Sequence, residues 1–176
     1  TTASAQATPN DAKTGTLLLR TGTPGVFVAA PKVETDVAIH VTGIVARTRA
    51  DEIVLLERDA NGDGKPDAVR KLLTNLRHPH GLALHDGWLY VGESNGIGRI
   101  RFDAESGRVS GAFEHVVDDF TDDGFHTTKT LGFGPDGWLY VSQGSSCNVC
   151  IEKDERRATI MRMQPDGSQR EIYATG

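Results

Sequence analysis

The sequence lacks the long apolar segments of membrane-spanning proteins and the excess of basic residues typical of nucleic-acid-binding proteins. No segment approaches the ~18 consecutive apolar residues of a membrane-spanning helix, and no long stretch repeats its apolar residues with the helical period of about 3.6. The 19 basic residues are outnumbered by 24 acidic ones, and the net charge is −5. This balance excludes a broad basic surface for a nucleic-acid backbone, and no membrane span is expected.

Cysteine is also scarce, because the only two, Cys147 and Cys150, stand as C-x-x-C in a loop rich in glycine and serine. A structural zinc site needs four ligands, and the sequence has no second C-x-x-C and no His-x₃-His to supply them. A thioredoxin-type pair precedes a helix, and no helical pattern follows closely here. Zinc and thioredoxin chemistry are therefore disfavoured, and a small disulfide that stiffens the loop remains open.

Glycine, in contrast, is plentiful, with 20 residues, and it punctuates an internal repeat. Residues 80–94 read HGLALHDGWLYVGES and residues 130–145 read TLGFGPDGWLYVSQGS. Trp88 and Trp138 lie 50 positions apart, each inside Gly-Trp-Leu-Tyr-Val. A repeat of this period, built from short strands and glycine turns, is typical of the blades of a β-propeller. Propellers carry their chemistry on loops at the blade ends.

Short alternating apolar segments between turns predict an all-β chain. From residue 51 onward we expect about ten strands, or two to three four-stranded antiparallel blades of a partial β-propeller, preceded by a short β-rich segment. The predicted divisions are a disordered tail at 1–14, a β-rich segment at 15–50 and the blades at 51–176. Only residues 152–157 suggest a helical turn. Because a closed propeller needs at least four blades, self-association that completes the ring is one expectation.

The segment DANGDGKPD is the strongest turn signal in the chain and also matches part of a calcium loop. Positions 1, 3, 5, 7 and 9 of such a loop are filled by Asp59, Asn61, Asp63, the Lys65 carbonyl and Asp67. Position 12 is Arg70 instead of the bidentate glutamate of the full motif. Asn-Gly and Asp-Gly also suit a β-turn between two strands. The sequence favours the turn slightly and keeps a structural calcium ion as the alternative.

Three further segments carry a resemblance to a known family. These are HPHGLALHDGWLYVGE at 78–93, the pattern from His126 to Cys150 that contains LGFGPDGWLYVSQGSSCNVC, and RRATIMRMQPDG at 156–167. Over residues 52–176 the chain resembles the glucose/sorbosone dehydrogenases, which are soluble, usually exported six-bladed propellers that use pyrroloquinoline quinone (PQQ) and calcium. The resemblance implies oxidation of a sugar C1 hydroxyl or aldehyde hydrate, hydride transfer to PQQ, an external electron acceptor, and a periplasmic or secreted location.

The resemblance also assigns roles to residues. It implies that His126 is the catalytic base, a task that suits an imidazole whose ordinary pKa is about 6.5; without it, His126 reads as a surface-loop histidine. Basic candidates for the carboxylates of the quinone are Lys129 and Arg157, and candidates for contacting the sugar are His80, Ser145 and Asn148. Because the family is exported, Cys147 and Cys150 are expected to form a disulfide.

The family pattern continues, after a segment like residues 172–176, into a Leu-Arg-Asn-Pro stretch that supplies an arginine and an asparagine to the quinone. The resemblance therefore implies that much of the quinone site lies beyond Gly176. At the other end, residues 15–49 resemble the opening of a VIT domain, which predicts a junction near residues 50 and 51. The alternative function is a non-catalytic, calcium-stabilised, exported β module that binds protein or carbohydrate.

Overall fold

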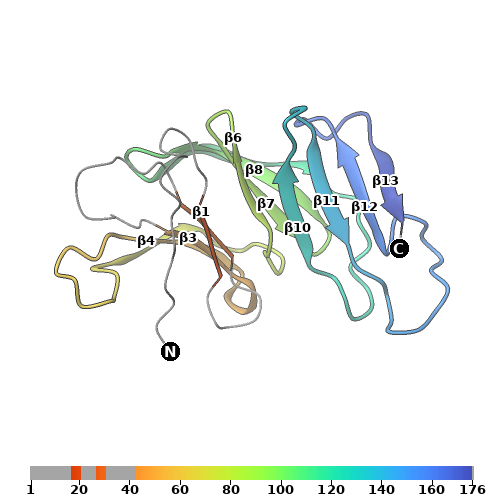
Figure 1. Cartoon of the computed structure of the whole chain (residues 1–176), viewed down its shortest axis with the longest axis horizontal. Coiled ribbons are helices and arrows are strands. Elements are labelled where there is room, and N and C mark those ends of the chain that lie inside the picture. Colours follow the sequence, from red (N-terminus) through yellow and green to blue (C-terminus); the bar gives the residue numbers. More distant parts are fainter. Residues whose placement is uncertain (1–16, 21–26, 31–42, 176) are drawn as a thin grey trace, which may run out of the picture.

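The computed structural model describes residues 17–20, 27–30 and 43–175, which form three antiparallel sheets in a row (Figure 1). In every sheet the strands follow one another in chain order, as in propeller blades. The first sheet contains β1 (Leu17–Arg20), β2 (Phe27–Ala30), β3 (Gly43–Arg47), β4 (Glu52–Leu56) and β5 (Val69–Leu73). The second contains β6 (Leu82–His85), β7 (Trp88–Glu93), β8 (Gly96–Asp103) and β9 (Arg108–Val117). The third contains β10 (Lys129–Phe133), β11 (Leu139–Gln143), β12 (Thr159–Met163) and β13 (Glu171–Thr175).

The all-β, blade-like architecture predicted from the sequence is confirmed. Within the described ranges the one helical element is a 3-10 turn, η1 (Thr48–Ala50). Residues 152–157, predicted to form a helical turn, instead form bends and hydrogen-bonded turns. No helix in this part of the chain is long and apolar enough to cross a bilayer. The predicted tail at 1–14 and most of the segment at 15–42 lie outside the described residues.

The predicted junction near residues 50 and 51 falls in the connection between β3 and β4, which pair along their whole length. Asp51 has a φ of 53°, which lets the chain reverse there. The buried carboxylate of Glu52 accepts from Arg47 before the turn at 2.6 Å and pairs with Lys71 of β5 at 2.7 Å. The first sheet is therefore tied together across this position, and the division of the chain into modules stays a prediction.

The sequence repeat corresponds to a repeated packing pattern. Leu89 and Val91 in β7, and Leu139 and Val141 in β11, are each completely buried. A guanidinium covers each repeated tryptophan, with Arg101 at 4.0 Å from the Trp88 ring and Arg162 at 4.7 Å from the Trp138 ring. Leu89 and Val91 pack in the layer between the first and second sheets, and Leu139 and Val141 in the layer between the second and third. Tyr90 is also buried, on the opposite face of β7, because the second sheet is covered on both faces.

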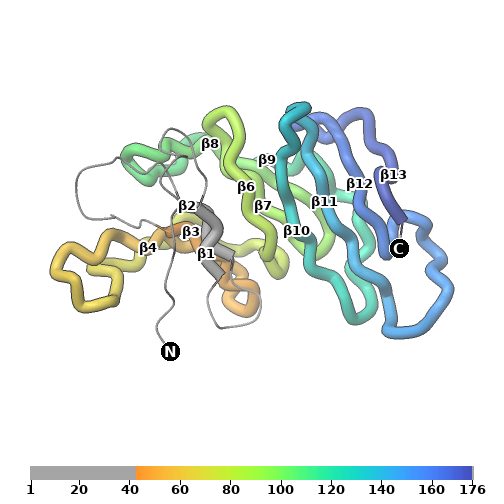
Figure 2. The backbone as a smooth tube through the Cα atoms, in the orientation of Figure 1, coloured from red at the N-terminus to blue at the C-terminus, as the bar shows by residue number. Residues whose placement is uncertain are grey.

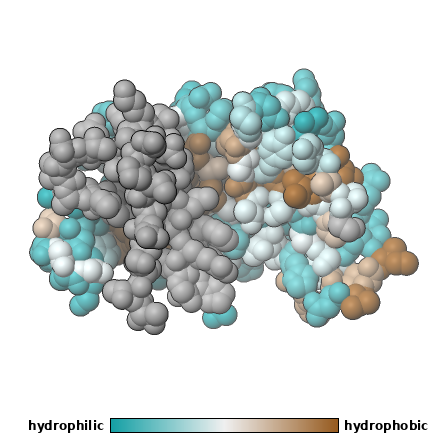
Figure 3. All heavy atoms as spheres, viewed as in Figure 1, coloured by the Kyte–Doolittle hydropathy of each residue, from teal (hydrophilic) through white to brown (hydrophobic). Residues whose placement is uncertain are grey.

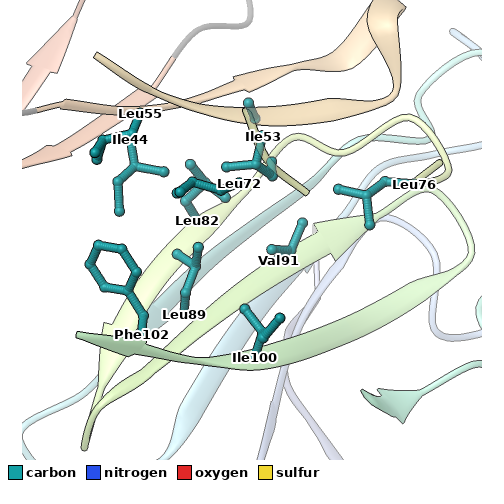
Figure 4. Close-up of a cluster of buried hydrophobic side chains, with 11 residues drawn as sticks. Ile44, Ile53, Leu55, Leu72, Leu76, Leu82, Leu89, Val91, Ile100 and Phe102 are labelled. Carbon is teal, nitrogen blue, oxygen red and sulfur yellow. The ribbon is translucent and has the colours of Figure 1, made fainter. Parts of the chain in front are cut away.

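Two apolar layers hold the three sheets together. Between the first and second sheets, side chains from both faces interdigitate (Figure 4); they include Ile44, Ile53, Leu55, Leu72, Leu82, Leu89, Val91, Ile100 and Phe102. Between the second and third sheets the layer includes Tyr90, Ile97, Val117, Phe120, Leu131, Leu139, Val141, Met161 and Met163. Burial of these layers supplies the main driving force for stacking the sheets.

Glycines allow the second and third sheets to approach closely where β6 and β7 meet β10. A Cβ at Gly81 would lie 2.4 Å from the Lys129 carbonyl oxygen, and one at Gly92 would lie 3.1 Å from the Lys129 Cβ. Strands β6 and β7 both contact β10 in this region. The two glycines therefore bring the start of β10, and the loop that precedes it, against the second sheet.

Candidate functional site

The predicted base His126 lies on the loop between β9 and β10, residues 118–128, which we call the His126 loop. The cysteine loop, residues 144–158, connects β11 to β12 and leaves the same end of the third sheet (Figure 2). The imidazole of His126 is exposed, and its Nε2 lies 3.0 Å from the Asn148 side-chain oxygen. The structure thus brings together two of the residues predicted for the site, 22 positions apart in the chain.

The backbones of these two loops are pressed against each other. The Phe125 amide donates to the Ser146 carbonyl at 3.0 Å. A Cβ at Gly144 would lie 2.5 Å from the His126 carbonyl oxygen and 2.6 Å from its Cβ, and one at Gly124 would lie 2.3 Å from the Ser146 oxygen. Glycine at both positions therefore permits a contact that a larger residue would prevent.

The cysteine loop is internally fixed. Cys147 and Cys150 form a disulfide, the Ser145 hydroxyl donates to the Cys147 carbonyl at 2.7 Å, and the Ser146 amide donates to the Glu152 carboxylate at 2.7 Å. Cys147, Cys150 and Glu152 are the one group of metal-ligand residue types that converge within the described ranges. Because the two sulfurs are bonded to each other, they are not thiolate ligands in this state.

Arg157, predicted to contact the quinone, lies between the two loops and hydrogen-bonds the His126 loop, and its Nη1 is buried without a hydrogen-bond partner among the described residues. Its side chain is 2% exposed and donates to the Thr121 hydroxyl at 3.0 Å. It also donates to the Asp123 carbonyl at 2.6 Å and to the Asp123 carboxylate at 2.5 Å. A buried guanidinium with these partners fixes the course of the His126 loop.

The acidic residues before His126 are mostly paired with arginines. Asp119 accepts from Arg156 at 3.1 Å and from Arg170 at 2.5 Å, and Asp122 pairs with Arg77 at 2.6 Å. Hydrogen bonds from Arg156 also lower the pKa of Asp154 to about 2. The pairs of Asp119 and Asp122 join segments distant in sequence, so sequence spacing alone could not reveal them.

Lys129 was the other candidate for the quinone, and it is completely buried. Its ammonium donates to the Ser94 carbonyl at 2.9 Å and to the Thr127 carbonyl at 2.8 Å. Burial, and next the positive charge of Arg157, lower the pKa of Lys129 to about 8, while Asp122 opposes the shift. Lys129 therefore connects the second sheet to the residue that follows His126.

His80, predicted to touch the sugar, is 8% exposed at the entry to β6. Its Nδ1 lies 3.4 Å from the Lys129 carbonyl oxygen. Burial lowers the pKa of His80, and the bond to that carbonyl opposes the shift only in part. The structure thus places His80 in the interface between sheets, whereas His126 and Asn148 are at the surface.

The predicted calcium loop lies in the first sheet, between β4 and β5. The Asp59 carboxylate accepts from the amides of Gly62, Asp63 and Gly64 at 2.7, 3.1 and 2.7 Å. The Asp63 amide also donates to Asn61, the Lys65 amide to Asp63, and the Ala60 amide to Asp67. The side-chain oxygens predicted as ligands thus accept backbone N–H groups, as they would in a tight turn.

We expect Asp59→Ala to destabilise the protein by about 1–2 kcal/mol, because three backbone amides lose their acceptor. Thermal unfolding of the wild type and the variant, each with calcium and with a chelator, measures this cost and tests the ion. If calcium binds here, it raises the melting temperature of the wild type but not that of Asp59→Ala. Ala60→Gly, a change on the same loop that keeps every predicted ligand, should retain the calcium response. Equal melting temperatures of wild type and Asp59→Ala would contradict the turn-stabilising role.

A cavity of about 600 Å³ lies elsewhere, where the first sheet meets the turn between β8 and β9. Its walls include Glu57, Arg70, Lys71, Leu72, Ser106, Arg108 and Val109. None of the residues predicted for catalysis, for the quinone or for the sugar is among them. The chemistry proposed for this chain therefore depends on the surface of the two loops and not on this cavity.

Comparisons with known proteins agree with the blade architecture. Residues 29–176 match the protein family described as "Domain of unknown function (DUF7133)", and no curated protein matches the sequence. The resemblance of residues 15–49 to a VIT domain stays a prediction.

Solved structures share the fold at low sequence identity. The PQQ domain of pyranose dehydrogenase from Coprinopsis cinerea, in its holo form, has a TM-score of 0.61 at 15% identity, covering 73% of this chain and 32% of its own. The PQQ-bound aldose sugar dehydrogenase from Streptomyces coelicolor gives 0.57 at 22%, covering 89% and 50%. A calcium structure of a Trichoderma reesei enzyme of carbohydrate-active family AA12 gives 0.57 at 19%, covering 90% and 42%. This chain thus spans half of their length or less.

Proposed function

The chain belongs to the family described as "Domain of unknown function (DUF7133)", and we propose that it is part of a quinone-dependent sugar dehydrogenase with His126 as general base. One observation carries the proposal: an exposed imidazole is held at the end of a blade, in a fold shared with the PQQ domain of a pyranose dehydrogenase and with a PQQ-bound aldose sugar dehydrogenase. An exported location, periplasmic or secreted, is part of this proposal and suits the disulfide.

The contribution of this chain would be proton transfer. An exposed imidazole can accept the proton of a sugar C1 hydroxyl at near-neutral pH. Lys129 is completely buried and bonded to protein carbonyls. Arg157 is buried and bonded to Thr121 and Asp123, while its Nη1 is buried without a hydrogen-bond partner among the described residues. Contact of these cations with a quinone stays a prediction. We therefore derive no step through PQQ and assign these two cations to fixing the His126 loop. Ser145, whose hydroxyl is bonded to the Cys147 carbonyl, also supports the loop.

The proposal is tested by adding PQQ and calcium to the protein, supplying a panel of aldoses, and following reduction of an artificial electron-acceptor dye. We expect turnover that falls to background in His126→Ala, because the proton acceptor is lost. Thr128→Ala, an exposed change on the same loop, should keep it. If the wild type neither turns over a sugar nor changes the absorbance of added quinone, this chain does not carry out the proposed reaction by itself.

A second candidate function is a non-catalytic binding module. Apolar side chains on the two loops are unusually exposed, with Phe125 at 76% and Val149 and Ile151 at 96% each. Figure 3 shows apolar surface at the end of the molecule where these loops lie. Exposed apolar groups on adjacent loops suit contact with a partner. Saturable binding of an oligosaccharide or a second copy of the chain, without turnover, would favour this function over the enzyme.

A further inference from the structure

We infer that Asn148 is the positioning residue of His126 and that it leaves Nδ1 as the basic nitrogen of the imidazole. The importance of Nδ1 for catalysis rests on the proposed function, whereas the hydrogen bond and the protonation pattern do not. The disulfide between Cys147 and Cys150 contributes to this positioning, because the two cysteines flank Asn148 in the cysteine loop.

The chemistry of the hydrogen bond fixes which nitrogen carries the proton. The Asn148 side-chain oxygen, 3.0 Å from Nε2 of His126, has lone pairs and no hydrogen, so it can only accept. Nε2 must therefore be protonated to make this bond. A neutral imidazole has one protonated and one unprotonated nitrogen, so its lone pair in the plane of the ring is on Nδ1.

The surroundings of Asn148 keep its oxygen in place. The disulfide closes a short ring that contains Asn148 and limits the conformations of the loop. The Ser145 hydroxyl holds the Cys147 carbonyl at 2.7 Å, and the Ser146 carbonyl accepts from the Phe125 amide beside His126 at 3.0 Å. Donor and acceptor are thus carried by two backbone segments that are already bonded to each other.

This arrangement also suits the charged state of a general base. When Nδ1 takes the proton of a substrate hydroxyl, the ring becomes an imidazolium and Nε2 keeps its proton. The bond to Asn148 then becomes charge-assisted, and such bonds are shorter and stronger than neutral ones. Asn148 would thus hold the ring before the proton transfer and support it afterwards, without moving.

Nitrogen-15 NMR of the histidine side chains, recorded well above the ordinary histidine pKa of about 6.5, tests the inference directly. The His126 signals are identified by their absence in His126→Gln. We expect the wild type to show Nε2 protonated and Nδ1 unprotonated. In Asn148→Ala the excess of this form over the other tautomer should fall by roughly fivefold, the factor expected for one neutral hydrogen bond.

Two further variants separate positioning from general disturbance of the loop. The double variant Cys147→Ser, Cys150→Ser should shift the tautomer ratio towards that of Asn148→Ala. Val149→Ala, whose side chain is 96% exposed, should leave the ratio as in the wild type. An unchanged ratio in Asn148→Ala, or a wild type protonated at Nδ1, overturns the inference. Because the readout needs neither PQQ nor turnover, failure of the proposed function leaves this result separately interpretable.

Discussion

Gly81→Ala is expected to lower the free energy of unfolding by about 3 kcal/mol, at the upper end of the cost of overpacking. A Cβ at this position would lie 2.4 Å from the Lys129 carbonyl oxygen, 2.9 Å from the Leu131 amide nitrogen and 3.1 Å from the Thr130 Cα. All three are backbone atoms of β10, so no flexible side chain can turn aside. The change would force the second and third sheets apart. Urea unfolding followed by tryptophan fluorescence measures the loss.

Two other glycines serve as controls, because an added Cβ would meet a more distant neighbour at one and no neighbour within 4 Å at the other. At Gly92 an added Cβ would meet the Lys129 Cβ and carbonyl oxygen at 3.1 Å, so Gly92→Ala should cost less than Gly81→Ala. At Gly132, in β10 itself, nothing lies within 4 Å, and the alanine variant should change stability little. If all three variants unfold at the same urea concentration, steric contact between the sheets is not what requires glycine at position 81.

The blades were predictable from the sequence because local pattern fixes them. The alternation in Leu89-Tyr90-Val91 and Leu139-Tyr140-Val141 matches the pleat of a strand, and the preceding glycines mark the turns. The first copy of the repeat, residues 80–94, contains β7 (Trp88–Glu93), and the second copy, residues 130–145, contains β11 (Leu139–Gln143). Such elements depend on residues a few positions apart, which a single sequence displays directly.

The candidate site was less predictable because it depends on contacts between distant segments. The sequence placed His126 and Asn148 on loops, but only the pairing of β10 with β11 brings those loops to the same end of a sheet. Lys129 reads as a cation available to a ligand, yet the approach of β7 through Gly92 buries it against the Ser94 carbonyl. A sequence pattern shows the charge of such a residue but not which backbone oxygens will surround it.

Lys129 is expected to make stability rise with pH between about 8 and 10.5. Burial and the charge of Arg157 lower its pKa to about 8 in the folded protein, from an ordinary value of 10.5. In this window the unfolded chain binds more protons than the folded one, so the free energy of unfolding increases as pH increases. The gain amounts to on the order of 3 kcal/mol and is complete above the ordinary pKa of lysine. Urea unfolding at a series of pH values measures it.

The difference between wild type and Lys129→Met isolates this residue from other groups that titrate at high pH. Methionine binds no proton in either state, so the stability of the wild type relative to the variant should rise by on the order of 3 kcal/mol across the window. Lys129→Arg, charged throughout, should also lack the rise while keeping donors for the Ser94 and Thr127 carbonyls. Lys65→Met, at an exposed lysine, should retain it. If the difference in the free energy of unfolding between wild type and Lys129→Met stays constant with pH, the pKa of Lys129 is not lowered by folding. The ammonium would then not occupy the buried position in which it bonds the Thr127 carbonyl of the His126 loop.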